Sequence, residues 1–311
     1  MTTQIAAVVV TYFPDDRVTE RLTAIRGQVD RLGIIDNGSP AETRTVLETW
    51  AAANGAAVLA NEENRGLAAA LNQGMAWGGE AGCAWVITFD QDSMPQPGLV
   101  AALLATAQSA AVPEQVAVVG ANTFDERTGR EDRWLRPAWW GFQRASCSSD
   151  DLHGVTFVIT SGALTRIRAW RELGGFDEGL FIDYLDHDLC LKARRAGWEV
   201  CVSASARLAH NLGAKREVAV AGRRLRPTFH SATRHYYMAR NRILMWRRYA
   251  WRYPHWWLFD ACFGALNLLR VLLAEDRCGE KLAAMLRGTL HGVSGRSGPM
   301  EFPGDNALPP S

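Results

Sequence analysis

Two aspartates lie where a buried strand is predicted to end, in the segment Phe89-Asp90-Gln91-Asp92-Ser93. The residues before them, 83–88, are mainly apolar and predict that strand. In an open α/β sheet, ligands bind outside the carboxyl ends of the strands. Two carboxylates there repel each other unless a cation lies between them. A hard divalent cation that also holds a substrate diphosphate fits this pattern. The alternative is a pair of solvated turn residues, since Asp is common in turns.

A second group of acids, Asp183, Asp186 and Asp188, lies at the start of a predicted helix over residues 185–196, which Gly197 ends. A positioned carboxylate can remove a proton from a hydroxyl group. Asp183 and Asp186 are three residues apart and could share one face of a helix. The three acids are therefore candidates for a general base. The alternative is that they only favour the positive end of the helix dipole.

The elements that must position these residues alternate between strand and helix over the first 125 residues. Such alternation predicts right-handed crossovers and a mostly parallel, Rossmann-like central sheet flanked by helices. The predicted strands cover residues 5–12, 32–36, 57–60, 83–89 and 116–121, and the predicted helices cover residues 15–29, 42–54, 67–77 and 99–109.

Polar side chains follow four of these strands, and the carboxyl ends of parallel strands meet at one edge of a sheet. No Gly-x-Gly-x-x-Gly follows the first strand and the chain has no Gly-Lys-Ser/Thr, which argues against a dinucleotide fingerprint and a Walker-type phosphate loop. We therefore predict a different ligand-binding edge. Its four polar groups are Thr11 and Tyr12, Asp36 and Asn37, residues 61–66, and residues 90–93.

The alternation stops after Asn122. A polar segment, 125–151, is predicted to be a loop, although it holds Trp134, Trp139 and Trp140. His210 follows the last predicted strand and is a candidate third ligand for the metal or the diphosphate, although a lone histidine is more often structural. The elements predicted in this part are a strand over residues 155–160, a helix over 167–173 and a strand over 200–206.

The composition is that of a globular protein with a sizeable core. The chain has 311 residues, of which 48% are hydrophobic and 22% charged, enough for one large domain or two small ones. The net charge of +1 argues against a general nucleic-acid binder. Twelve basic residues nevertheless lie between Arg207 and Arg252, with Glu217 as the one acid, so the C-terminal third carries a basic patch.

The cysteines and the N-terminus bear on the compartment. The six cysteines form no Cys-x-x-Cys pair and several lie in apolar runs, so we expect small buried hydrophobes in a reducing compartment. The chain starts with polar residues and a strand, so we expect no signal peptide. Both points favour a cytoplasmic protein.

The C-terminal region predicts contact with a membrane surface. The most apolar stretch, 256–274, is interrupted by Asp260, Asn267 and Arg270, which predicts a buried or interfacial helix rather than a spanning one. Tryptophan and arginine alternate over residues 246–257, which suits a bilayer interface with anionic lipid. The alternative is a packing seam rich in tryptophan.

Six motifs occur in a fixed order along the chain. They are Val-Thr-Tyr-Phe-Pro-Asp (10–15), Ile-Asp-Asn-Gly-Ser (35–39), Asn-Arg-Gly-Leu-Ala-Ala-Ala-Leu-Asn-Gln-Gly (64–74), Phe-Asp-Gln-Asp-Ser (89–93), Thr-Ser-Gly-Ala-Leu (160–164) and the run from Gly-Gly-Phe-Asp-Glu to Ala-Gly (174–197). Together they resemble the inverting glycosyltransferases of family two, most closely the bacterial rhamnosyltransferases that use dTDP-L-rhamnose. The likeness covers about residues 5 to 245.

The resemblance implies a GT-A fold with a nucleotide half and an acceptor half on one continuous sheet. It implies that Thr11 and Phe13 line the base pocket and that Asp36 hydrogen-bonds the pyrimidine ring. The loop near the base and ribose is then formed by Asn64, Arg65 and Gly66.

The resemblance also implies the roles at the reacting end of the donor. Asp90 faces the ribose, with Gln91 beside it, and Asp92 binds Mg²⁺ or Mn²⁺. Asp186 matches the catalytic base, although the family often has Glu-Asp where this chain has Leu-Asp. Arg240 lies in a run, 235–242, that resembles the family and is expected to close over the diphosphate; the alternative is a plain amphipathic helix with a basic face.

We therefore expect a rhamnosyltransferase of cell-surface polysaccharide (O-antigen) biosynthesis, acting on a saccharide or lipid-linked saccharide at the inner face of the cytoplasmic membrane and binding no nucleic acid. Two alternatives stay open, a UDP-sugar donor and a non-catalytic protein that binds nucleotide sugars. The expected regions are a glycosyltransferase domain over 1–245, with nucleotide (1–125) and acceptor (126–245) halves, a membrane-associated helical region over 246–291, and a disordered tail over 292–311.

Overall fold

The computed structural model describes residues 3–125, 129–139, 141–209, 218–220, 223–225 and 230–300. The chain forms two compact units. The first comprises Met1–Leu135, Arg144–Glu178 and Leu185–His210, and the second comprises Arg136–Gln143, Gly179–Tyr184 and Asn211–Ser311.

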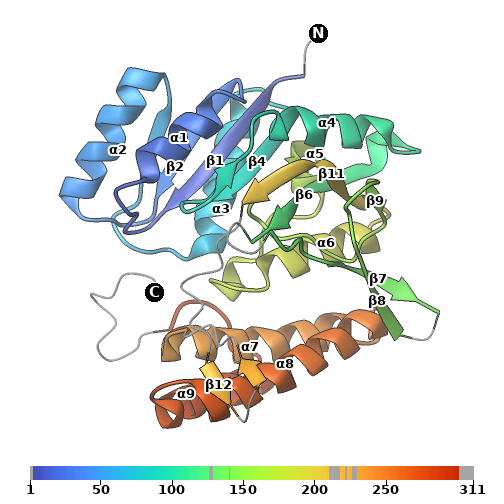
Figure 1. Cartoon of the computed structure of the whole chain (residues 1–311). Helices are drawn as coiled ribbons and strands as arrows, with labels where there is room; N and C mark the ends of the chain where they lie inside the picture. Colours follow the sequence, from blue (N-terminus) through green and yellow to red (C-terminus); the bar gives the residue numbers. More distant parts are fainter. Residues whose placement is uncertain are drawn as a thin grey trace. The chain divides into compact units, whose positions relative to one another are not determined.

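The first unit is built on one sheet whose strands lie in the order β3-β2-β1-β4-β10-β6-β11-β5, with β9 beside β11 (Figure 1). Strands β1 to β4 pair in parallel, as predicted, and β6 pairs in parallel with β11. The strands are β1 (Ile5–Thr11), β2 (Arg31–Asp36), β3 (Ala57–Ala60), β4 (Trp85–Asp90), β5 (Met94–Pro95), β6 (Val116–Phe124), β9 (Leu152–His153), β10 (Ala163–Arg166) and β11 (Glu199–Ala209).

Helices cover both faces of this sheet, because its strands are apolar on both faces. Alternate residues of β1, such as Ala7 and Val9, join a core with α1, α2 and α4. Val8, on the other face, meets α3 so closely that a Cβ on Gly74 would lie 2.3 Å from it. The helices of this unit are α1 (Val18–Arg26), α2 (Ala41–Asn54), α3 (Leu67–Glu80), α4 (Leu99–Ser109), α5 (Ile167–Glu172) and α6 (Leu185–Arg195).

Two sequence predictions fail after residue 122. The predicted strand over 155–160 is absent: the run is irregular, and Val158 is buried because it fills the space above Gly120, where a Cβ would lie 2.7 Å away. The strand that pairs with β4 and β6 is instead β10, and it is antiparallel to both. The predicted loop over 125–151 contains a hairpin, β7 (Trp134–Ala138) and β8 (Gly141–Ala145); Trp140 lies outside the described residues.

The second unit is mainly helical, with α7 (Ala232–Tyr249), α8 (Pro254–Ala274) and α9 (Cys278–Val293), and it holds the short pair β12 (Val218–Val220) and β13 (Arg223–Leu225). Helix α7 passes continuously through position 245, where we expected one region to end. Of the predicted tail, residues 301–311 lie outside the described residues, whereas the backbone N–H of Met300 donates to the Tyr237 hydroxyl at 2.8 Å.

Candidate donor and catalytic site

The ends of β1 and β2 bring Thr11 and Asp36 together, because the two residues are register partners. The Thr11 hydroxyl donates to Asp36 Oδ1 at 3.1 Å, and the Ser39 backbone N–H donates to Oδ2 at 3.1 Å. Neither Thr11 nor Asp36 has any exposed surface. In this arrangement Asp36 shapes the turn after β2, and its predicted contact with a pyrimidine ring stays a prediction.

The same turn fixes the start of the neighbouring loop. The Ser39 hydroxyl accepts a hydrogen bond from the backbone N–H of Phe13 at 3.0 Å. Phe13 has a φ of 49°, a left-handed conformation that is uncommon for a large side chain. The predicted base-pocket residue Phe13 is thus held in a strained conformation, which is a frequent property of binding sites.

Asparagine side chains organise the loop that follows β3. Asn37 donates through Nδ2 to Asn64 Oδ1 at 2.9 Å, and its Oδ1 accepts from Asn61 Nδ2 at 3.1 Å and from the Arg65 backbone N–H at 3.2 Å. Asn64 Oδ1 also accepts from the backbone N–H of Gly66 at 2.9 Å. The predicted residues Asn64, Arg65 and Gly66 therefore lie beside the end of β2.

Strand β4 delivers the acidic segment to the same edge. Gln91 binds the backbone of Tyr12 twice: the Tyr12 N–H donates to Oε1 at 2.7 Å and Nε2 donates to the Tyr12 carbonyl at 3.1 Å. Asp90 is half-buried, and Asp92 is exposed. Among the described residues, the Asp92 carboxylate makes no hydrogen bond or ion pair. The prediction that the four strand ends converge is confirmed.

A pair of serines supports this acidic segment; the sequence motifs contain both of them, but the sequence did not show that they are neighbours. The hydroxyls of Ser93 and Ser161 lie 2.6 Å apart, and Ser161 Oγ accepts from the Asp90 backbone N–H at 3.3 Å. The proximity of Ser161 follows from the antiparallel β10, which pairs with β4 immediately after that serine. Because a strand was wrongly predicted at 155–160, the sequence did not place Ser161 beside the acidic segment.

The structure separates the three candidate bases. Asp183 has a φ of 62° and precedes α6, so it does not share a helix face with Asp186. It forms an ion pair with Arg234 at 3.1 Å, and the fully buried Asp188 forms one with Lys192 at 2.6 Å. Asp186 is half-buried, accepts from the His187 backbone N–H at 2.8 Å, and borders a small cavity with Thr88 of β4. Of the three, Asp186 combines the start of α6 with nearness to β4.

The segment that leads into α6 is strained and clamped. Phe181, Asp183 and Tyr184 all have positive φ values, between 62° and 68°. Within the second unit, Asn241 Nδ2 donates to the carbonyls of Leu180, Ile182 and Asp183 at 2.9, 2.7 and 3.2 Å. A strained segment persists only when its surroundings hold it, and the fully buried Asn241 is a large part of that hold.

Arg240 belongs to the same clamp. Its guanidinium donates to the carbonyls of Gly179 and Leu180 at 3.1 and 3.0 Å and to Asn241 Oδ1 at 3.0 Å, and Arg240 has no exposed surface. These contacts give Arg240 a positioning role. Its predicted contact with a diphosphate stays a prediction, and His210, the predicted third ligand, lies outside the described residues.

Replacing Asn241 by Ala should lower the free energy of unfolding by about 1–3 kcal/mol, because the half-buried carbonyls of Ile182 and Asp183 lose this donor and the Leu180 carbonyl keeps only Arg240. Urea denaturation checks this. Asn54→Ala is the matched control, since the Asn54 amide donates only to Trp50 one turn earlier in the same helix, and it should change stability by no more than about 0.5 kcal/mol. Equal effects of the two substitutions would contradict the clamp.

An open pocket of about 520 Å³ lies on the first unit next to Arg65. Its wall includes Asn72 and Trp170 and the glycine pair Gly174-Gly175. Asn72 ties that pair in place, since it accepts from the Phe176 backbone N–H at 2.8 Å and donates to the Phe176 carbonyl at 2.9 Å. The pocket wall thus combines an aromatic ring with amide, guanidinium and carboxylate side chains.

The sequence profile of Glycosyl transferase family 2 matches residues 6–174, a stretch that contains every strand end of this site. The chain belongs to glycosyl transferase family 2. It is therefore a glycosyltransferase enzyme. The family that the six motifs predicted is confirmed.

Individual relatives agree with the family. The dTDP-rhamnosyl transferase RfbF of Shigella flexneri is 24% identical over 317 residues, which cover 96% of this chain and 98% of that protein. The mannosyltransferase PcManGT from Pyrobaculum calidifontis, solved with GDP-Man and Mn²⁺, has a TM-score of 0.57 at 14% identity, over 93% of this chain and 87% of that one. GalNAc-T7, solved with UDP, GalNAc and Mn²⁺, has a TM-score of 0.55 at 15% identity, over 71% of this chain; the match spans 45% of that longer chain. The structural likenesses show the GT-A fold.

Proposed function

We propose that this glycosyltransferase moves rhamnose from dTDP-L-rhamnose to a hydroxyl of a saccharide acceptor, with inversion at the anomeric carbon. The observation that carries the donor assignment is the alignment with a dTDP-rhamnosyl transferase over almost the whole of both chains. At the edge where β1 to β4 end, the nucleotide would contact the buried turn after β2 and the loop after β3, which asparagine side chains hold in place.

The mechanism needs a base on the face of the sugar opposite the leaving diphosphate. Asp186 takes the proton from the acceptor hydroxyl, and the hydroxyl oxygen then attacks the anomeric carbon as the bond to the diphosphate breaks. The hydrogen bond from the His187 backbone N–H orients the carboxylate. Asp186 lies in the first turn of α6, where the positive end of the helix dipole favours a negative charge.

A divalent cation fits the residues at the end of β4. Asp92 is exposed and, among the described residues, its oxygens are uncommitted, while Asp90 lies two residues away. Carboxylate oxygens are hard ligands that suit Mg²⁺ and Mn²⁺. Asp92 would hold the ion, with Asp90 turned toward the ribose. When bound, the ion neutralises charge that develops on the departing diphosphate.

The donor assignment is tested by a panel of dTDP-rhamnose, UDP-glucose, UDP-galactose and GDP-mannose, with release of the nucleoside diphosphate as the readout. We expect the highest kcat/KM with dTDP-rhamnose. Faster turnover with a UDP-sugar would refute the donor and leave the fold and family intact. Absence of release with every donor, in the presence of metal and acceptor, would favour the non-catalytic alternative.

The acceptor is proposed to enter at the pocket beside Arg65. Trp170 offers an aromatic face to a sugar ring, and Asn72 and Arg171 lie in the same wall. Polar groups around an aromatic ring are the usual pattern for a site that orients a polar ligand. This supports a saccharide as the acceptor and says nothing of its linkage.

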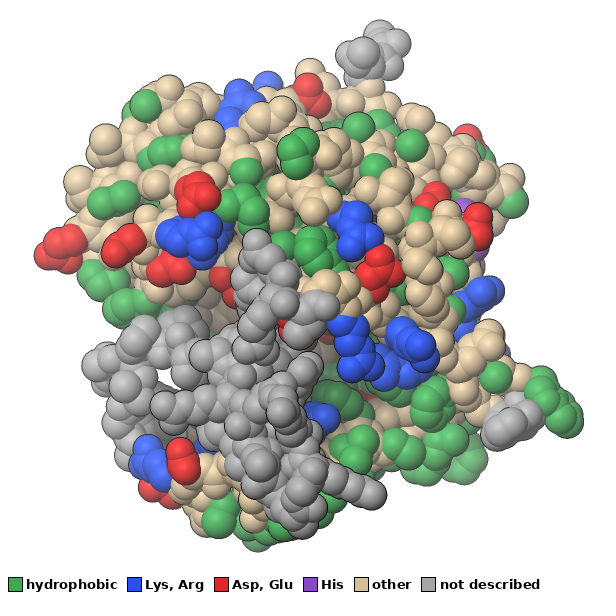
Figure 2. Space-filling model, viewed as in Figure 1, with side chains coloured by type: hydrophobic (Ala, Val, Ile, Leu, Met, Phe, Trp, Pro, Cys, Tyr) green, Lys and Arg blue, Asp and Glu red, His purple; other side chains and the backbone are tan. Residues whose placement is uncertain are grey.

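A bilayer surface is the proposed location of that acceptor, and α8 supports it. Among the described residues, α8 is the one helix long and apolar enough to cross a membrane, and 17% of its most apolar window is buried. Its leucines face outward, whereas its inward face combines the polar residues Asp260 and Asn267 with Trp256, Gly264 and Val271. Figure 2 shows hydrophobic side chains gathered over this helix at the lower right of the view.

The inward face of α8 is committed to the second unit. Asp260 accepts from the Tyr184 hydroxyl and the Trp246 indole N–H, each at 2.7 Å, and from Arg242 at 3.2 Å. Burial raises the pKa of Tyr184 well above its usual value, so its hydroxyl stays a donor. A helix tied along one side in this way lies in the plane of a bilayer rather than across it.

Two tryptophans of the second unit are almost fully exposed. Trp251, which precedes α8, is 99% exposed, and Trp139, at the tip of the β7–β8 hairpin, is 94% exposed. A ring contact of 5.4 Å between Phe142 and Phe259 holds the hairpin beside α8. Tryptophan at the edge of an apolar face suits the headgroup region, where one end of the ring is wet.

The triple variant Leu266→Glu/Leu269→Glu/Leu273→Glu should reduce partitioning onto anionic lipid vesicles by about tenfold or more, because it removes apolar contact and adds repulsion. Co-sedimentation measures this. Val46→Glu on α2 is the matched control, since Val46 is 52% exposed and Leu266 is 53% exposed. Unchanged partitioning of the triple variant would leave the face without a role in membrane binding.

A further inference from the structure

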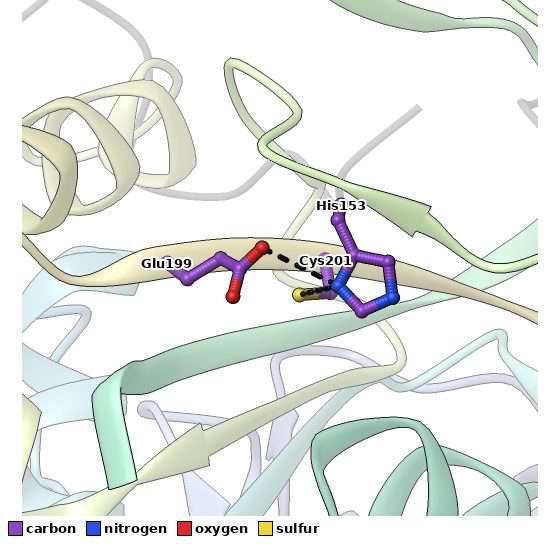
Figure 3. A group of neighbouring side chains, drawn as sticks. All are labelled: His153, Glu199 and Cys201. Atoms are coloured by element: carbon purple, nitrogen blue, oxygen red, sulfur yellow. Dashed lines mark hydrogen bonds and ion pairs between the residues drawn. The ribbon is translucent and has the colours of Figure 1, made fainter. Parts of the chain in front are cut away.

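A cluster of three different metal-ligating side chains lies at the far edge of the first unit's sheet (Figure 3). Cys201 of β11 and His153 of β9 are register partners in an antiparallel pair. Glu199 lies two residues before Cys201 on β11, and its carboxylate lies beside the same His153 ring. The cluster has no part in the chemistry proposed above.

The directions of the strands show that the cluster lies far from the donor edge, which is the edge of the sheet where β1 to β4 end. β10 is antiparallel to both β4 and β6, and β11 is parallel to β6, so β11 runs in the direction of β4. Glu199 opens β11, whereas the donor residues follow the carboxyl end of β4. The cluster therefore lies toward the amino ends of the parallel strands, and the donor residues lie at their carboxyl ends.

The spacing of the ligand atoms matches a tetrahedral ion. His153 Nδ1 lies 3.3 Å from Glu199 Oε1 and 3.4 Å from Cys201 Sγ, and all three atoms lie within 4.8 Å of one another. Zinc binds nitrogen and oxygen at about 2.0–2.2 Å and sulfur at about 2.3 Å, so tetrahedral angles put such ligands roughly 3.3 to 3.6 Å apart.

Hydrogen bonding is the alternative explanation of the cluster, with the imidazole and the thiol both beside the Glu199 carboxylate. Both neighbours converge on Nδ1, which either donates one proton or accepts one. If it donates to Glu199, it cannot accept from the thiol, and 3.3 Å is longer than the usual range for such bonds.

We propose that His153, Glu199 and Cys201 bind a zinc ion that fastens β9 to β11. A thiolate and an imidazole select zinc over Mg²⁺ and Mn²⁺, which prefer oxygen ligands. Water fills the fourth position, since the side chains of His153 and Glu199 are 39% and 27% exposed. On binding, the thiol loses its proton to solvent and the sulfur bonds to the ion.

The test is a titration of the metal-free full-length protein with Co²⁺, followed by absorbance. A cobalt–thiolate bond gives a near-ultraviolet charge-transfer band that carboxylate ligands do not give, so binding at Asp92 does not interfere. We expect the band to appear at one ion per chain, to be abolished by Zn²⁺ and to survive excess Mg²⁺. Zn²⁺ should also raise the melting temperature by mass action.

Substitutions distinguish a thiol that binds the metal from a thiol that is only buried. Cys201→Ser should abolish the band, whereas Cys147→Ser should keep it; Cys147 is also fully buried and lies 3.6 Å from the Val202 carbonyl of the same strand. Glu199→Gln keeps the shape of a half-exposed side chain and should weaken Co²⁺ binding by about tenfold or more. Absence of the band in the wild-type protein, or its persistence in Cys201→Ser, would overturn the proposal.

Discussion

Asp186→Asn should lower turnover by about a hundredfold or more while leaving donor affinity nearly unchanged. The amide keeps the shape of the side chain, and its oxygen can still accept from the His187 backbone N–H, but the basicity is lost. Steady-state kinetics with the best donor of the panel, together with calorimetric donor binding, measures the two effects separately.

The neighbouring acids are the controls for this experiment. Asp183→Asn weakens an ion pair with Arg234, and Asp188→Asn removes the charge that faces Lys192. Both should affect stability more than the chemical step. Normal turnover by Asp186→Asn together with loss in one of the others would move the base to that residue. If all three variants stay active, single displacement with a carboxylate base is wrong.

Asp92→Ala should abolish the dependence of donor binding on Mg²⁺ or Mn²⁺ and reduce turnover by about a hundredfold or more, since charge on the leaving diphosphate is no longer neutralised. Calorimetry with the nucleotide sugar, in metal and in chelator, measures the dependence. For the wild-type protein we expect clearly tighter binding in metal.

The matched control for Asp92 is Glu48→Ala, an exposed acid on α2 away from the donor edge. It should leave both metal dependence and turnover unchanged. Equal donor affinity of the wild-type protein in metal and in chelator would exclude a metal role in donor binding. A variant Asp92→Ala that keeps full metal dependence would move the ion to other residues.

The nucleotide half could be predicted from sequence because its physics is local and repetitive. Apolar runs such as that of β1 are buried on both faces, and parallel strands must end at a common edge, so Thr11, Asp36 and Asp90 had to be neighbours. The predicted bounds of β3 and α4 are those observed. The predicted ends of the strands were therefore enough to locate the edge where these residues meet.

The catalytic half was harder because its contacts are distant in sequence. The run 155–160 has the composition of a strand, but Val158 is apolar because it covers Gly120, which no local pattern reveals. The partner of Ser93, Ser161, lies 68 positions away. The roles of Asp183 and Asp188 depend on which cation each one meets, and periodicity does not encode this.

Helix α8 shows a different limit. Asp260, Asn267 and Arg270 were read as interruptions of an apolar helix, and the prediction that this helix does not span a membrane stays a prediction, since its length and composition would allow it to cross one. The buried alternative is not supported, since Leu266, Leu269 and Leu273 are about half exposed. Sequence reasoning found the polar residues but not that the Asp260 side points inward, because its partners Tyr184 and Arg242 come from other elements.

The clamp on residues 179–184 has a consequence for the order in which the protein becomes an enzyme. Asn241 lies 58 to 61 positions after the carbonyls that it binds. While the chain is being synthesised, all strands of the donor edge leave the ribosome well before α7. The segment that leads into Asp186 can be held by Asn241 only after α7 has been synthesised. Under the proposed function, a nascent chain therefore completes its nucleotide-binding strands before the segment that positions the proposed base, Asp186.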